Sequence, residues 1–376
     1  MNPVLEIQLI ALVVAVAASL PGVFLILRKM AMMTDAITHT ILLGIVIAFF
    51  LTGSLSSPLL IVGAALMGLF TVFLTEVLNN TGLVSKDSAI GIVFPLLFSI
   101  AIILISKYAG SVHLDTDSVL LGQIEFAPFD RLIVRGRDIG PRALYIMGAI
   151  LLLNLAFVAI FFKELKLVSF DPGLAAVLGI APSLIHYMLM AIVSITAVGA
   201  FEAVGSILVI AFMVGPPATA YLLTDDLAKM LVLSSILGGI NGLLGFRLAM
   251  YYDVSIAGSM ALMTGLTFLL VFVLAPKRGL ITSLRRRKRQ EKEFAANSLL
   301  FHLLNHELEE DSSYHNNIGN IEENLNWSKK KLDQLVEGLE AQGKIRLEGP
   351  LIKLTDPGRS YAITSYEDIV GSLKEL

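Results

Sequence analysis

The 376-residue sequence has no cysteine, a single tryptophan and few charges, since Asp, Glu, Lys and Arg together make up 16%. An ordinary globular domain carries about 25% charged residues, so this chain cannot cover a water-facing surface of normal polarity along its whole length. Without thiols it forms neither disulfides nor thiolate metal sites. We therefore exclude a soluble enzyme, a disordered regulator and a disulfide scaffold. A hydrophobic content of 56% and a mean hydropathy of +0.78 indicate a membrane protein.

Sequence motifs for enzymatic chemistry are also missing. The chain has no Gly-x-x-x-x-Gly-Lys-Ser/Thr segment, so it does not supply its own phosphate-binding loop for ATP. It has neither a His-Glu-x-x-His motif nor a serine-protease arrangement, which leaves membrane-embedded proteolysis without support. We expect a protein that catalyses no covalent reaction.

Long apolar runs occupy residues 1–280. A membrane-spanning helix needs about 20 mostly apolar residues. Nine stretches meet this requirement: 5–27, 36–55, 58–78, 89–105, 142–162, 183–199, 204–223, 229–249 and 254–275. The predicted fold class is an all-α polytopic membrane protein with eight or nine transmembrane helices, followed by a small α+β domain.

The modest net charge of −3 hides two unlike parts. Residues 291–376 carry 16 acidic and 9 basic residues, whereas residues 1–290 carry 15 acidic and 19 basic ones. We therefore predict a transmembrane domain over 1–280, a basic linker over 281–295 and a water-soluble domain over 296–376.

The basic run Arg285–Arg289 fixes the expected orientation, because Lys and Arg accumulate on the cytoplasmic side of membrane helices. It predicts a multi-pass protein of the cell's inner or plasma membrane with a cytoplasmic C-terminal domain and an external N-terminus. Counting spans puts residues 106–141 outside although they carry four basic residues. We interpret that loop as a folded external or partly re-entrant segment.

The first chemically informative pair is Asp35 and His39, at the start of an apolar segment. Residues four apart share one face of a helix, which lets a carboxylate and an imidazole bind one divalent cation. Ionisable groups at membrane depth usually face a water-filled cavity or a bundle interior. The alternative is a helix start, with Thr34 or Asp35 capping free backbone N–H groups.

A second feature is the link from Phe170 to Ile180 between two spans. Asp171 suits a helix N-cap, Pro172 the first helical position and Gly179 the turn that ends the helix. The pattern predicts a helix of about two turns with a small apolar surface, which fits contact with a soluble partner. The alternative is a well-ordered loop without that role.

A third feature combines Glu202 and Gly205 with the pair Pro216-Pro217. Glycine and proline here predict breaks in helical continuity, which membranes tolerate only where protein or a water-filled cavity satisfies the freed backbone groups. We interpret Gly205, Pro216 and Pro217 as part of a gate or pathway wall. Glu202 is a candidate metal ligand or, alternatively, an exposed interfacial charge.

Taken in order, these three features resemble the membrane permease subunit of the ABC-3 family of metal ABC transporters. The family's early motif, Gly-Asp-Ala-x-Ser-His-Ala-Val-Leu-Pro-Gly, is similar to residues 34–44, with Thr34 and Leu43 as departures. Its later Val-Gly and Pro-Ala-Ala-Thr-Ala motifs are similar to residues 204–220, with Pro217 as a departure. Its coupling-helix region is matched at about 170–181, by Asp171, Pro172, Ala175 and Leu178-Gly179.

The resemblance covers residues 5–276 and implies import of manganese, zinc or iron(II). It implies that Asp35 and His39 hold the metal on its path and that the 170–181 helix receives the motion of cytoplasmic ABC ATPase subunits. It further implies an extracytoplasmic metal-binding protein and a second permease subunit, the same or similar, in the lipid bilayer. Residues 201–205 and 112–115 look more like the manganese branch, so manganese is the first expectation, transported as substrate with no resident cofactor.

Residues 296–364 resemble a winged-helix domain. A helix is expected near Asn297–Glu309, another over Ile318–Asn324 and an amphipathic one from Ser328 to Gly343, followed by a hairpin over 344–354. The net charge of −7 over 291–376 argues against nucleic-acid binding, which needs a basic face. A regulatory or protein-contact role fits better. His302, His306 and His315 also suggest metal sensing, although surface histidines are more often unliganded.

Two rival functions remain open at this point. One is a secondary metal transporter driven by an ion gradient, with the soluble domain as an addition. The other is a membrane-tethered transcriptional regulator that uses the C-terminal domain on DNA.

Overall fold

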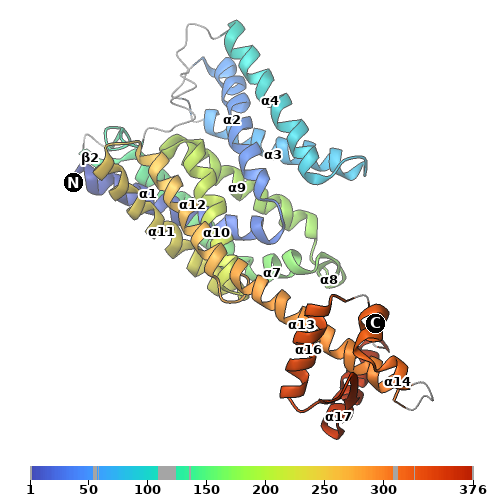
Figure 1. The fold of residues 1–376 in the computed structure, drawn as a ribbon. Coiled ribbons are helices and arrows are strands. Elements are labelled where there is room, and N and C mark those ends of the chain that lie inside the picture. Colours follow the sequence, from blue (N-terminus) through green and yellow to red (C-terminus); the bar gives the residue numbers. More distant parts are fainter. Residues whose placement is uncertain are drawn as a thin grey trace. The chain divides into compact units, whose positions relative to one another are not determined.

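The structure, a computed structural model, is mostly helical and describes residues 2–53, 57, 59–108, 124–134, 137–307, 312–325 and 327–374. Within these residues, nine helices are long and apolar enough to cross a membrane. Their positions confirm the predicted spans to within a few residues at each end. Figure 1 shows the fold. The contacts within the chain divide it into two units, Met1–Gly279 and Leu280–Leu376.

The nine candidate spans are α1 (Pro3–Leu27), α2 (Ala31–Thr52), α3 (Leu59–Asn80), α4 (Lys86–Tyr108), α6 (Arg142–Ile160), α9 (Pro182–Val204), α10 (Ser206–Leu223), α11 (Leu227–Tyr252) and α12 (Ile256–Leu274). The connections contain the hairpin β1 (Arg131–Val134) and β2 (Arg137–Pro141) and the helices α7 (Phe162–Phe170) and α8 (Pro172–Val177). The second unit contains α13 (Leu280–Asn305), α14 (Ser312–His315), α15 (Ile318–Asn324), α16 (Lys329–Ala341), β3 (Ile345–Glu348), β4 (Leu351–Leu354) and α17 (Asp356–Lys374).

The spans alternate in direction, which gives the first unit two ends. We call the end where α1 begins the Glu6 end and the end where α1 stops the Arg28 end. Arg131 of the β1–β2 hairpin marks the Glu6 end, because its guanidinium donates to the Glu6 carboxylate at 2.9 and 3.0 Å. It also donates to Asp138, and these two carboxylates raise the pKa of Arg131.

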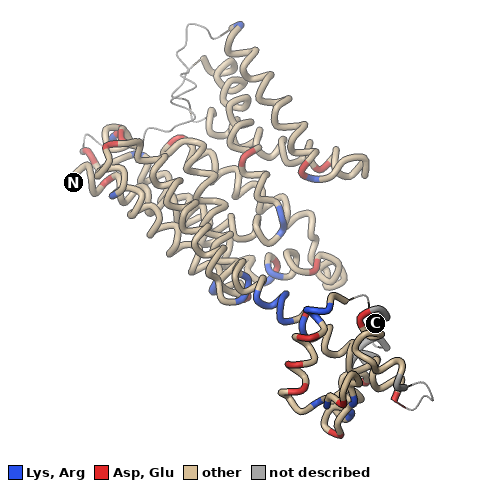
Figure 2. The backbone as a smooth tube through the Cα atoms, in the orientation of Figure 1, with Lys and Arg blue, Asp and Glu red and all other residues tan. Residues whose placement is uncertain are grey.

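Helix α1 lies at the centre of the first unit, where it packs against α6, α9, α10 and α11. Helices α2, α3 and α4 form a second group, which joins the first mainly through α9 and α10 (Figure 1). Charged residues gather toward the ends of the spans and along the start of α13, while the middle of the nine-helix body is almost free of them (Figure 2). This distribution suits a lipid environment, in which an uncompensated charge is costly.

The proline inside α1 leaves a backbone carbonyl that has a polar partner on α6. Pro21 has no N–H group, so the carbonyl of Ala17, four residues earlier, loses its helical hydrogen bond. The Asn154 side-chain amide, fully buried on α6, donates to this carbonyl at 2.8 Å and to the Thr196 hydroxyl at 3.0 Å. Asn154 therefore replaces the missing donor and ties α1 and α9 to α6.

Replacing Asn154 by Leu should lower the stability of the folded protein in detergent by roughly 0.6–1.7 kcal/mol, from the average to the largest value measured for hydrogen bonds between membrane helices. In a Pro21→Ala background, the restored N–H group would occupy the Ala17 carbonyl, so the same substitution should cost less. Thermal or denaturant unfolding of the four variants tests this coupling. Equal costs in both backgrounds would contradict it.

The described part of the 106–141 connection is a folded segment at the Glu6 end. Residues 124–130 form a turn in which Ile124 is fully buried, and the antiparallel β1–β2 pair follows. The Glu125 carboxylate accepts a hydrogen bond from the backbone N–H of Ile256 at the start of α12. These contacts support a folded connection; residues 112–115, cited for the manganese branch, lie outside the described residues.

The second unit begins with a long helix. The segment expected to be a basic linker, 281–295, is the first half of α13, which also contains the predicted helix near Asn297. Its later residues pack with α15, α16, the β3–β4 hairpin and α17 around a separate apolar core: Leu299, Leu300, Leu303, Ile321, Leu332, Val336, Leu339, Ile345, Ile352 and Ala362. The predicted α15 and α16 are present, and Gly343, at φ 67°, lies in the turn after α16.

An ion pair with two hydrogen bonds joins α17 to the segment that follows α13. Arg359 on α17 donates through Nε and Nη2 to the two carboxylate oxygens of Glu307, at 3.0 and 2.5 Å. Hydrogen bonding to Arg359 lowers the pKa of Glu307 below its usual value. The resulting stabilisation is present above the unfolded pKa, about 4.3, and is lost as pH falls through the lower folded pKa.

The single tryptophan, Trp327, packs against the core of the second unit and reports its unfolding within the full chain. At pH 7, Glu307→Gln should lower the stability seen by Trp327 fluorescence by up to about 1 kcal/mol, because the pair is partly exposed. The difference should shrink as the pH falls below the unfolded pKa of about 4.3 and disappear once the pH has passed through the lower folded pKa, where Glu307 is protonated in the unaltered protein too. A difference that persists in acid would contradict the ion-pair explanation.

Candidate functional site

Asp35 and His39 face each other on the first turns of α2. His39 Nε2 lies 3.3 Å from Asp35 Oδ1, and the two side chains are 20% and 39% exposed. Helix α2 begins four residues before Asp35, with Met30 as an N-cap that makes no side-chain hydrogen bond. The alternative in which Thr34 or Asp35 caps the helix is therefore wrong, and the carboxylate stays available for a ligand.

Neighbouring helices position the imidazole. The His39 ring lies 5.2 Å from the ring of Phe94 and 5.7 Å from that of Phe98, both on α4. At the next residue of α2, the Thr40 hydroxyl accepts a hydrogen bond from Thr71 of α3 at 2.7 Å. Thr34, next to Asp35, is fully buried, and its hydroxyl finds no partner within the described part of the chain.

Close packing fixes the position of α2 against α3. A Cβ atom added to Gly44 would lie 2.4 Å from the carbonyl oxygen of Gly63, so no side chain fits between the two backbones there. This contact, together with the Thr40–Thr71 hydrogen bond, determines the direction in which the Asp35–His39 face points.

Each chain offers only part of a metal coordination sphere. Among the described residues, no group of three His, Cys, Asp or Glu side chains is placed to hold an ion. A carboxylate and an imidazole are two of the four ligands that zinc uses, and fewer than the six preferred by a hard divalent cation. Water, backbone carbonyls or another chain must therefore complete any site built on Asp35 and His39.

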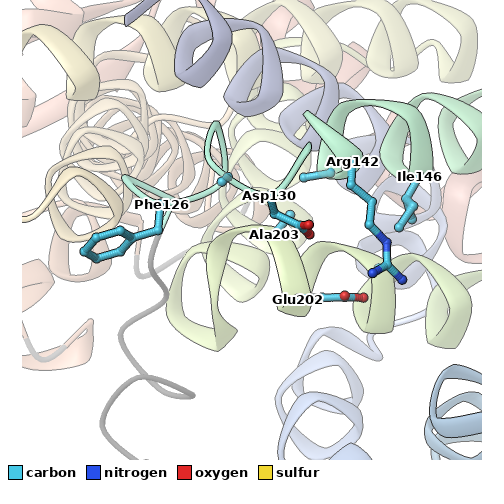
Figure 3. A pocket seen from close by; sticks show the side chains of 9 residues that line it. Phe126, Asp130, Arg142, Ile146, Glu202 and Ala203 are labelled. Atoms are coloured by element: carbon cyan, nitrogen blue, oxygen red, sulfur yellow. The ribbon is translucent and has the colours of Figure 1, made fainter. Parts of the chain in front are cut away.

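Glu202 does not join this pair. It lies near the end of α9 at the Glu6 end, where it and Arg142 border two cavities of about 210 and 250 Å³. Figure 3 shows the Arg142 guanidinium pointing toward Glu202, with Asp130 beside them in the first cavity. The second cavity is lined largely by apolar side chains, including Ile41 and Ile45 of α2.

The helix break predicted at Pro216-Pro217 is wrong. Helix α10 runs unbroken from Ser206 to Leu223 through both prolines, and the interruption is at Gly205, where φ is 80° and α9 gives way to α10. Pro216 and Pro217 are buried. The backbone of α10 at Met213 approaches Gly22 of α1 so closely that an added Cβ would overlap it. Pro217 thus packs close to Gly22 of α1.

The predicted short helix between spans is present as α8. The Asp171 carboxylate accepts from the Leu174 backbone N–H at 2.8 Å, Pro172 is the first helical residue and Gly179 has a φ of 82°. Ala175 is fully buried against the first unit, whereas Val177 is 84% exposed. Other apolar side chains of this surface are also exposed: Phe170, Leu174 and Leu178.

The three tail histidines lie together but do not form a metal site in this structure. The ring of His306 is 4.7 Å from that of His302 and stacks at 4.3 Å on that of His315. His302 Nε2 also lies 3.1 Å from the His315 carbonyl oxygen. The donor atoms do not meet the requirement for an ion site within the described residues.

Sequence reasoning missed a polar cluster at the Arg28 end. There His186 Nε2 lies 2.5 Å from Glu76 Oε1, and Arg28 contacts both His186 and Ser169. Each residue is isolated in the sequence, and each lies at the end of a different helix. The only available signal was the presence of Glu76 and His186 in otherwise apolar stretches.

The fold and these groups define a polytopic membrane transport subunit, with a carboxylate–imidazole pair on one span and an apolar helix exposed between two others. The sequence profile of the ABC 3 transport family matches residues 2–275. The chain belongs to this family, which confirms the resemblance found in its motifs.

Individual relatives cover different parts of the chain. It is 44% identical over 358 residues to the zinc transport system membrane protein TroD of Treponema pallidum (strain Nichols), which covers 95% of this chain and 97% of that protein. It is 46% identical over 282 residues to the manganese transport system membrane protein MntD of Bacillus subtilis (strain 168), which covers 75% of this chain and 95% of that protein. The similarity to TroD therefore extends into the second unit.

A solved structure shares the fold of the first unit. PsaBC from Streptococcus pneumoniae, in complex with Fab, is 30% identical with a TM-score of 0.62. The match covers 74% of this chain and 94% of the other.

Proposed function

We propose that this chain is the permease subunit of an ATP-driven importer of divalent metal ions, with manganese as the first candidate and zinc as the alternative. The observation that supports this best is the carboxylate–imidazole pair of Asp35 and His39 on a membrane span of an ABC 3 family member. ATP hydrolysis belongs to separate ATPase subunits, because the chain has no phosphate-binding loop of its own.

The choice of metal rests on the ligand types. Carboxylate and imidazole ligands without thiolates suit manganese, zinc and iron(II). Relatives named for zinc and for manganese are 44% and 46% identical to this chain, so identity alone does not separate the two metals. An incomplete ligand set fits a transporter, since a substrate ion must also leave.

A second permease subunit would supply what one chain lacks. Asp35 is partly exposed, so its free face is open to ligands from outside the chain. A paired permease that presents its own carboxylate and imidazole across a shared path would raise the number of ligands to four.

The cavities at the Glu6 end suit the receipt of an ion from an extracytoplasmic binding protein. Asp130 and Glu202 provide carboxylates at the first cavity, and Arg142 lies between the first cavity and the second. In this proposal Glu202 attracts the cation before it reaches α2, and Gly205 gives the α9–α10 connection its turn.

The Arg28 end would then face the cytoplasm. The basic start of α13 is consistent with this side, since Lys and Arg concentrate there. The arrangement of α15, α16 and the β3–β4 hairpin fits a winged-helix fold, and its acidic composition favours a protein-contact or regulatory role over DNA binding.

Asp35→Asn and His39→Gln should each reduce ATP-dependent metal uptake into proteoliposomes, assembled with the ATPase subunits, by at least about tenfold, since even outer-shell ligand partners contribute that much. Asp87→Asn is the matched control, because Asp87 also lies in the first turn of a span at the Arg28 end and is exposed. Uptake that survives both ligand substitutions would contradict the metal role. Uptake by the chain without ATPase subunits would favour a secondary transporter.

The exposed face of α8 should be required for ATPase binding. Val177→Asp places a charge on this apolar surface and should weaken ATPase binding in detergent by about tenfold or more, as at other interface anchors. Leu83→Asp is the control, since Leu83 is an 88% exposed apolar residue in another connection at the same end. Equal affinities for both variants would contradict the assignment of α8 as the docking helix.

A further inference from the structure

The polar cluster at the Arg28 end joins helices that are far apart in the sequence. Arg28 follows α1, Glu76 is on α3, and Ser169 and His186 are on α7 and α9. Arg28 Nε donates to the Ser169 hydroxyl at 3.1 Å, and its Nη1 lies 3.3 Å from His186 Nδ1. We call Arg28, Ser169, His186 and Glu76 the relay cluster.

Within the relay cluster, His186 contacts Arg28 through one ring nitrogen and Glu76 through the other. A guanidinium donates and never accepts, so His186 Nδ1 must be the acceptor of the Arg28 contact. Nε2, the other ring nitrogen, lies 2.5 Å from Glu76 Oε1. The cluster thus places the His186 imidazole between the Arg28 cation and the Glu76 carboxylate.

The surroundings of this cluster keep it intact. The side chains of His186 and Glu76 are only 14% and 24% exposed. Tyr187 also contacts the Glu76 carboxylate, and Lys86 interacts electrostatically with it. Burial lowers the pKa of Arg28 to about 10, so Arg28 remains charged at neutral pH. Separating such partly buried partners leaves charges without compensation, which resists independent movement of the helices.

Residues on both sides of α8 in the sequence contact Arg28. Ser169 lies two residues before Asp171, the N-cap of α8, and His186 lies in the first turns of α9, the helix that follows α8. Movement of α8 therefore displaces two side chains that both contact the same guanidinium.

The relay cluster is also connected, through α3 and α2, to the Asp35–His39 pair. Glu76 is five residues beyond Thr71 on α3, and Thr71 hydrogen-bonds to Thr40, the residue after His39 on α2. Helices α2 and α3 pack along their length, with Gly44 and Gly63 in backbone contact. A shift of α3 at Glu76 is thus carried to the helix that holds Asp35 and His39.

We propose that the relay cluster transmits displacement of α8 to α3, and through α3 to the Asp35–His39 pair on α2. This inference rests on the proposed function, because it takes α8 as the helix on which the ATPase subunits act. Arg28, His186 and Glu76 are positioning residues in it. They bind no metal and touch no nucleotide.

The test is the ratio of metal ions transported to ATP hydrolysed, in proteoliposomes that contain the full chain and its ATPase subunits. Glu76→Gln and His186→Phe should lower this ratio by about fivefold or more, within the usual range of coupling between sites, while ATP hydrolysis changes by less than about twofold. Arg28→Lys keeps the charge but cannot contact Ser169 and His186 together, so it should also lower the ratio.

Asp225→Asn is the matched control. Asp225 pairs with Lys277 at 3.1 Å and Arg278 at 2.5 Å at the same end of the first unit, but it lies outside the relay cluster. Its substitution should leave the ratio unchanged. A ratio that stays constant in the relay variants, or falls equally in the Asp225 control, would overturn the relay. The same holds if transport and hydrolysis decline in parallel, because that would indicate a merely structural role.

A second measurement detects the movement itself. Because the chain has no cysteine, Met32→Cys at an exposed position of α2 can be labelled specifically. Addition of ATP to the assembled complex should change its labelling rate, and Glu76→Gln should remove most of that change. An unaltered complex that responds to ATP but carries no metal would refute the proposed substrate while supporting the relay. A response that persists in Glu76→Gln would refute the relay alone.

Discussion

The structure depends on one constraint, which is that a chain in lipid must satisfy its own backbone polar groups. In the part of the chain that the structure describes, nine helices meet most of that requirement internally, and the exceptions are visible at particular residues. Pro21 frees the Ala17 carbonyl, and Asn154 reaches it from α6. At Pro216 the freed carbonyl is that of Phe212, which the Ser19 hydroxyl approaches at 3.4 Å from α1. The polar side chains buried among the spans thus hold the bundle together and leave few groups free for other roles.

The polar and charged side chains that do not serve the helix backbones are functional candidates, because burying such groups in a membrane is costly. Asp35 and His39 contact each other, and His39 also lies against the rings of Phe94 and Phe98. Glu202 and Arg142 border cavities at the Glu6 end, while the relay cluster connects several helices at the Arg28 end. The Asp35–His39 pair therefore lies between a charged opening and a polar connection to α8, which is the order that the proposed transport path requires.

Much of this architecture could be predicted from the sequence because it is local. Spans follow from run length, α8 follows from Asp171, Pro172 and Gly179 within nine residues, and the Asp35–His39 pair follows from helical spacing. Pairs such as Glu76–His186 and Arg131–Glu6 join residues more than 100 positions apart, and no local pattern indicates them. The break expected at Pro216-Pro217 was wrong because the packed neighbour α1 lets the helix continue. The basic linker proved helical because its Arg- and Lys-rich sequence contains good helix formers.

The central claim is that Asp35 and His39 hold the transported ion. The most direct test is an anomalous diffraction map, recorded at the manganese absorption edge, of the assembled transporter loaded with Mn²⁺. We expect a peak within coordination distance of the Asp35 carboxylate and the His39 imidazole. A peak confined to Glu202 and Asp130, or to Glu76 and His186, with none at α2, would contradict the account.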